Sequence, residues 1–144
     1  MNEWERDWEK YEGWAKTFIP RIRAWYECEW TKSGYMLAQV FTGHGVFGKH
    51  LKRIRVERSA ECWFCSERED TPEHTLWMCP EWESYRAEAK VGGLDLNRST
   101  IGNELVESKS EWIAFEGLIE KILRAKIVKE NERKKSGVRN LVRT

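Results

Sequence analysis

The chain has 144 residues, of which 40% are hydrophobic and 34% are charged, and its formal net charge at pH 7 is +1. This length suits a single domain with one modest hydrophobic core, and the hydrophobic content, with nine tryptophans, excludes a disordered polar chain. A net charge so close to zero points to no class of partner, and no stretch is long and apolar enough to span a bilayer.

Aromatic residues recur at helical spacing in the first part of the chain. We expect a first helix with Asn2 as its N-cap, which Gly13 interrupts only weakly. Pro20 suits the first turn of a second helix. The expected inner faces of these two helices are Trp4, Trp8, Tyr11 and Ala15 in the first, and Ile22, Trp25, Tyr26 and Trp30 in the second.

A third helix is expected from Tyr35 to Phe41, because the two glycines of the sequence Gly43-His44-Gly45 predict a sharp reversal after it. His44 could contact a phosphate or a base there, although a hydrogen bond to its own loop is the commoner role. A basic helix should follow, with Phe47, Leu51 and Ile54 on its apolar face.

The outer face of this basic helix carries cations, which are the usual contacts of nucleic-acid phosphates. A solvated helix face explains the same residues equally well. The candidate phosphate contacts are Lys49, Lys52, Arg53, Arg55 and Arg58.

Helices are expected again after Pro80, since residues 59–80 lack a long periodic pattern. A short helix from Trp82 to Ala89 should end at Gly92-Gly93, and Ser99 or Thr100 is placed to cap another near Leu105. The last helix should run from about Ser108 to Lys135 and fray beyond about Lys129. Its buried stripe is expected to be Trp112, Phe115, Ile119 and Ile122.

The sequence therefore predicts an all-α fold with one small metal-held loop and a long C-terminal helix. We divide it into an N-terminal helical region over 1–58, a knuckle over 59–81, and C-terminal helices with a basic tail over 82–144.

The knuckle contains the pattern C-x2-C-x8-H-x4-C, formed by Cys62, Cys65, His74 and Cys79. The acidic, aromatic N-terminus is not a signal peptide, so we expect a reducing compartment, where cysteines favour metal over disulfides. Three thiolates and an imidazole favour zinc, and four protein ligands leave no open position for water, so the site is expected to be structural. Cys28 lies on a helical segment and is interpreted as a buried free thiol.

Three aromatic residues lie beside these ligands. Trp63 and Phe64 suit either stacking on unpaired bases or local packing, whereas Trp77 favours core packing. The polar segment 66–73 should project into solvent. We find no Gly-rich phosphate loop, GxSxG motif or adjacent Asp-Asp pair, so no catalytic site is predicted.

Two segments resemble the polyprotein of insect non-LTR retrotransposons, in the clade that inserts into ribosomal or telomeric repeats. Residues 37–47 resemble its LTQxLTGHGxF segment, and residues 70–82 with Arg86 resemble its DTxEHTLxxCPxW motif. Val46 stands where the family often has Cys, and His50 where Tyr is common. Further similar positions are Trp4, Trp8, Trp14, Ile19, Pro20, Ile22, Trp25 and Trp112.

The resemblance implies a place after the reverse transcriptase domain, at the C-terminal end of the polyprotein, in a knuckle that engages element RNA. It also implies the same four zinc ligands, and a nuclear location after cytoplasmic transit as a ribonucleoprotein. Polymerase activity would belong to the parent protein, and we expect this chain to be non-catalytic. The chain would be an excised fragment, a truncated element copy or a module kept by a host.

The resulting hypothesis is a zinc-dependent RNA-binding module that assists template recognition in target-primed reverse transcription. Its partners would be the element transcript or an RNA–DNA hybrid and the parent reverse transcriptase domain, with no membrane. The alternative is a scaffolding domain that docks on the polymerase or on a second copy, with zinc purely structural.

Overall fold

The structure, a computed structural model, describes residues 2–32 and 34–137, and every regular element in those ranges is helical. The prediction of an all-α fold is confirmed. The end of the predicted basic tail, residues 138–144, lies outside the described residues. None of the described helices is long and apolar enough to cross a membrane.

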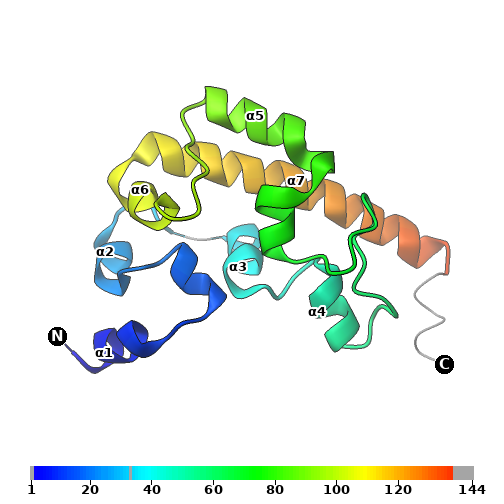
Figure 1. The fold of residues 1–144 in the computed structure, drawn as a ribbon, viewed down its shortest axis with the longest axis horizontal. Helices are drawn as coiled ribbons and strands as arrows, with labels where there is room; N and C mark the ends of the chain where they lie inside the picture. Colours follow the sequence, from blue (N-terminus) through cyan, green and yellow to red (C-terminus); the bar gives the residue numbers. More distant parts are fainter. Residues whose placement is uncertain (1, 33, 138–144) are drawn as a thin grey trace.

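The helices follow one another in an order close to the predicted one (Figure 1). The α-helices are α1 (Glu3–Lys10), α2 (Ile22–Glu27), α3 (Tyr35–Thr42), α4 (Gly48–Arg53), α5 (Glu83–Val91), α6 (Ile101–Glu107) and α7 (Lys109–Lys135). Shorter helical turns are the 3-10 helices η1 (Trp14–Thr17) and η3 (Pro80–Trp82) and the π-helix η2 (His74–Met78).

Helix α7 runs along the length of the molecule, and α3, α5 and α6 pack against it (Figure 1). Ser108 caps its first turn by accepting a hydrogen bond from the backbone N–H of Glu111 at 3.3 Å. The predicted stripe is confirmed: its buried residues include Trp112, Phe115, Ile119 and Ile122. The helix ends at Lys135, as predicted, and the expected fraying beyond Lys129 stays a prediction.

The N-terminal helices are shorter and less buried than predicted. Asn2 forms the expected N-cap as part of a capping box with Glu5. Helix α1 ends at Lys10, however, because the backbone of Tyr11 is already extended, and the extended Gly13 then precedes η1. Tyr26 was expected on an inner face, but its side chain is 74% exposed.

The turn between α3 and α4 follows the prediction closely. Gly43 ends α3 with a φ of +74°, a left-handed conformation that glycine adopts without a steric penalty. The side chain of Gln39 then accepts a hydrogen bond from the backbone N–H of Val46 at 3.0 Å. Phe47 and Leu51 are buried, but α4 ends at Arg53, so Ile54 lies beyond it and is half exposed, contrary to prediction.

Candidate metal centre

The predicted ligands meet at one point. The Sγ atoms of Cys62, Cys65 and Cys79 and a ring nitrogen of His74 all lie within 4.8 Å of one another. Cys62 Sγ and Cys79 Sγ are 3.9 Å apart, and Cys65 Sγ lies 3.2 Å from His74 Nε2. Zinc–sulfur bonds of about 2.3 Å in a tetrahedron would separate two sulfurs by about 3.8 Å. The four residues could therefore hold one metal ion.

Two local structures bring these ligands together. Cys62 and Cys65 lie in a tight turn, closed by a hydrogen bond from the backbone N–H of Ser66 to the carbonyl of Cys62 at 3.1 Å. His74 begins the π-helix η2 and Cys79 directly follows it, and the N–H of Cys79 donates to the carbonyl of His74 at 2.7 Å. Residues five apart in an α-helix point about 140° away from each other. The wider π-helical turn brings this pair to one side instead.

Burial controls the electrostatics of the cluster. It raises the pKa of the Cys62 thiol, and it raises the pKa of Cys79 to about 12. It lowers the pKa of His74. Without a cation, these groups therefore favour their neutral forms. A bound metal ion would replace the thiol protons and supply the charge that holds the thiolates together.

Asp70 connects the ligand loop, residues 59–81 of the knuckle, to the rest of the molecule. Its Oδ2 accepts hydrogen bonds from Lys126 Nζ at 2.6 Å and from the backbone N–H of Gly48 at 3.2 Å. Its Oδ1 accepts from Thr75 Oγ1 at 3.2 Å. Asp70 is 2% exposed, so the expectation that segment 66–73 projects into solvent is wrong at this residue. No sequence pattern predicted this role, although Asp70 stands in the motif that carries the resemblance.

Arg86, a further residue of that motif, fixes the other side of the loop. Its guanidinium donates to the backbone carbonyls of Thr75, at 3.0 Å, and of Cys79. The carbonyl of Thr75 lies within the π-helical turn and that of Cys79 directly follows it, so Arg86 holds the end of the turn from helix α5.

The aromatic residues beside the ligands all have packing partners. The rings of Phe64 and Trp82 are in edge contact at 4.8 Å, and the guanidinium of Arg133 lies 5.1 Å from the Trp63 ring. Trp77 packs on the core, as expected, and its Nε1 donates to the carbonyl of Leu96 at 2.9 Å. Trp63 and Phe64 are half-buried, and base stacking by either stays a prediction.

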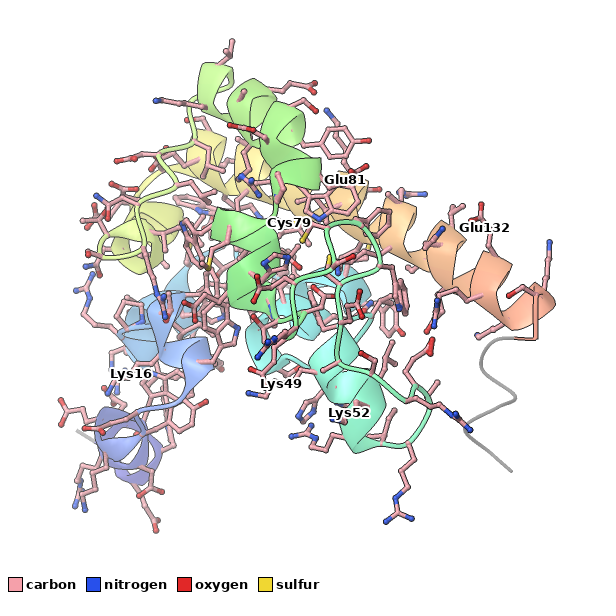
Figure 2. All side chains as sticks on the ribbon, turned by 45° about the vertical axis from the view of Figure 1, so that its right-hand side comes forward. Lys16, Lys49, Lys52, Cys79, Glu81 and Glu132 are labelled. Atoms are coloured by element: carbon pink, nitrogen blue, oxygen red, sulfur yellow. The ribbon has the colours of Figure 1, made fainter. Side chains whose placement is uncertain are left out.

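All five predicted phosphate contacts are exposed, and Figure 2 shows Lys49 and Lys52 near each other in the lower half of the view. They do not share one helix face, because Arg55 and Arg58 follow the end of α4. Arg55 has a φ of +64°. Cys28 is half-buried rather than fully buried, with its Sγ 3.9 Å from the carbonyl of Val106.

Comparison with curated proteins finds significant relatives. Over 104 residues the chain is 30% identical to a retrovirus-related Pol polyprotein from a type-1 retrotransposable element R1 of Nasonia vitripennis, covering 68% of the chain and 26% of the relative. Over 108 residues it is 24% identical to the Pol polyprotein from the R1 element of Popillia japonica, covering 74% and 42%. The chain spans less than half the length of either relative.

No family model matches the chain, and no solved structure matches it at a significant level. The curated relatives, however, carry the same designation in two insects. The chain is therefore homologous to a region of the Pol polyproteins of R1 retrotransposable elements, which confirms the resemblance to insect non-LTR retrotransposons drawn from the sequence.

Proposed function

We propose that the chain is a zinc-stabilised helical module that binds RNA, or an RNA–DNA hybrid, during reverse transcription of a retrotransposon. One observation carries the proposal. The loop that holds His74 and Cys79 is joined through Asp70 to the first turn of the cationic helix α4, by bonds to the backbone N–H groups of Gly48 and Lys49. Metal in the cluster would thus fix the position of α4.

Zinc is the metal that best suits this donor set. Three thiolates and an imidazole are soft and intermediate ligands, which disfavour magnesium and calcium. Four protein ligands close a tetrahedral shell, so the ion would stabilise the fold and would not activate water. The proposed ligands are Cys62, Cys65, His74 and Cys79.

Exposed cations on and after α4 would contact the nucleic-acid backbone, because lysine and arginine supply most phosphate contacts in such complexes. The proposed contacts are Lys49, Lys52, Arg53, Arg55 and Arg58, all exposed. The element transcript is the proposed ligand, and the reverse transcriptase domain of a parent polyprotein is the proposed partner. We place the chain in the nucleus, after cytoplasmic transit as a ribonucleoprotein, and assign polymerase activity to the parent alone.

Binding of zinc-loaded protein to labelled single-stranded RNA across a salt series tests the proposal. Affinity should fall steeply with salt and disappear with a chelator. Lys52→Ala should reduce the slope of log affinity against log salt by about 1. Lys90→Ala removes the same charge from α5, far from α4 in Figure 1, and should leave the slope unchanged. No binding at low salt would refute an RNA-binding role.

The N-terminal surface favours a second candidate, docking of the chain on the polymerase or on a second copy of itself. Trp4 and Tyr26 are 41% and 74% exposed, and their ring centroids lie 6.0 Å apart across α1 and α2. Aromatic residues exposed side by side are typical of protein interfaces. A sizing column distinguishes self-association from the monomer, and Trp4→Ser should abolish self-association if this surface is responsible.

A further inference from the structure

The two segments that carry the family resemblance face each other across a groove of about 600 Å³. Gly43, His44 and helix α4 form one wall, and residues 69–73 form the other. The walls are fixed by the Asp70 carbonyl, which accepts from the N–H of Lys49 at 3.0 Å. This volume lies within the range of about 300–1,000 Å³ that small-ligand pockets occupy.

The groove has an apolar lining with an aromatic edge. Trp14, Phe47 and Pro72 contribute the apolar part of its lining. The ring of His44, which is exposed, lies nearly parallel to the ring of His50, with centroids 4.8 Å apart and planes 19° apart. Such a pair offers a flat surface on which a further planar ring can stack.

The charges around the groove differ between its two walls. Each acidic side chain on the residue 69–73 wall has a cationic partner: Glu69 with Lys49 at 3.8 Å, Asp70 with Lys126 at 2.6 Å, and Glu73 with Arg98 at 2.7 Å. Helix α4 contributes Lys52 and Arg53 to the same lining, and both are exposed. Within the part of the chain that the structure describes, the charge at the groove that has no ionic partner is therefore positive and lies along α4.

We propose that this groove holds one unpaired base of a single-stranded nucleic acid, stacked on His44, with the adjoining phosphates on Lys52 and Arg53. The inference rests on the proposed RNA-binding function and names the site within it. A base is planar and its phosphate is anionic, and the groove offers a stacking surface directly beside a positive edge. The proposed base site is therefore at His44. It is not at Trp63 or Phe64, because the ring of Trp63 packs against Arg133 and that of Phe64 against Trp82.

The test compares two probes that carry the same phosphates. Zinc-loaded protein is titrated with a fluorescent oligouridylate and with an abasic oligomer of equal length. The wild type should bind the intact oligomer roughly tenfold tighter, since one base stack is worth about that much. His44→Ala should bind both probes equally well while keeping the salt dependence of the wild type.

Two further variants serve as controls. Tyr35→Ala removes an aromatic ring that is 78% exposed, from the start of helix α3, and should keep the wild-type preference for the intact probe. Lys52→Ala should weaken binding of both probes by the same factor. Equal binding of the two probes by the wild type would refute the base site in the groove, and so would a preference for the intact probe that His44→Ala retains. Either result would leave the proposed RNA binding intact. Absence of binding to either probe would overturn both the groove and the proposed function.

Discussion

The ammonium of Lys126 donates to the carboxylate of Asp70 at 2.6 Å, and the two side chains are 1% and 3% exposed. The pair joins residues 56 positions apart, one in helix α7 and one in the ligand loop. The Lys126 ammonium also lies 5.2 Å from the ring of Phe47, at the start of α4. One buried charge pair thus fixes the ligand loop and helix α4 to helix α7.

Replacing Lys126 should be costly because it leaves the Asp70 carboxylate buried without its cation. Lys126→Met is expected to lower the free energy of unfolding by about 3–5 kcal/mol, as measured by urea denaturation with zinc present. Lys121→Met is the matched control. Lys121 pairs with Glu88 on the surface, where such pairs contribute about 0–1 kcal/mol. Equal costs for the two variants would show that the buried pair has no special role.

Gly48 lies where α4 approaches the backbone of the segment before Cys62. A Cβ at this position would lie 2.4 Å from the carbonyl oxygen of Ala60, and that backbone atom cannot move aside easily. Gly48→Ala should therefore destabilise the protein by about 1–3 kcal/mol in thermal or urea unfolding. Gly117→Ala is the control, because a Cβ there meets nothing within 4 Å. In the middle of α7 it should stabilise by about 0.5–1 kcal/mol, so a similar effect from both changes would contradict the close approach.

Glu57 anchors the C-terminal part of α7. Its carboxylate, 3% exposed, accepts from Arg133 Nε at 2.8 Å and from a second guanidinium nitrogen at 3.0 Å. Glu57→Gln should weaken this charge-assisted pair by about 1.5–3 kcal/mol. Hydrogen exchange should then accelerate over residues 130–135 and stay unchanged near Trp112. Glu132→Gln, on the outer side of the same turns, should leave exchange at wild-type rates (Figure 2). Acceleration in both variants would contradict the anchor.

Sequence patterns over a few neighbouring residues correctly predicted several features of the fold. The stripe of α7 follows from its helical period, and the end of α3 follows from the glycine at position 43. The spacing of the Cys and His residues likewise predicted which four would meet. Each of these features depends on residues that lie close together in the sequence, so it can be predicted without knowing the tertiary contacts.

Long-range features could not be predicted in the same way. Lys126 stands in a basic stretch and reads as an exposed cation, yet Asp70, far away in sequence, allows its burial. The exposure of Tyr26 depends on where α1 packs, and the π-helical turn at His74 has no periodic signature. These properties depend on tertiary contacts that overrule local propensity. The division into an N-terminal helical region, a knuckle and C-terminal helices stays a prediction.

Removing a metal ligand should loosen the knuckle and leave the helical core folded. Cys79→Ser is expected to lose bound zinc, measured by native mass spectrometry, because metal binding and folding are coupled in such sites. Trypsin should also cleave faster after Arg68, an exposed residue of the same loop. Chelation of the wild type should have the same effect. Cys28→Ser changes a cysteine outside the cluster and should keep both zinc and protease resistance.

Full zinc content and wild-type protease resistance in Cys79→Ser would exclude this residue as a ligand. The expected loosening also reaches α4. Asp70 accepts hydrogen bonds from the first turn of α4 and donates its own N–H to the carbonyl of Ala60. Both Asp70 and Ala60 lie in the knuckle, which should loosen when the metal is lost. The change from Cys79 to Ser should therefore weaken RNA binding even though it removes no cation. Unchanged RNA affinity after complete loss of zinc would mean that the basic helix keeps its position without the metal.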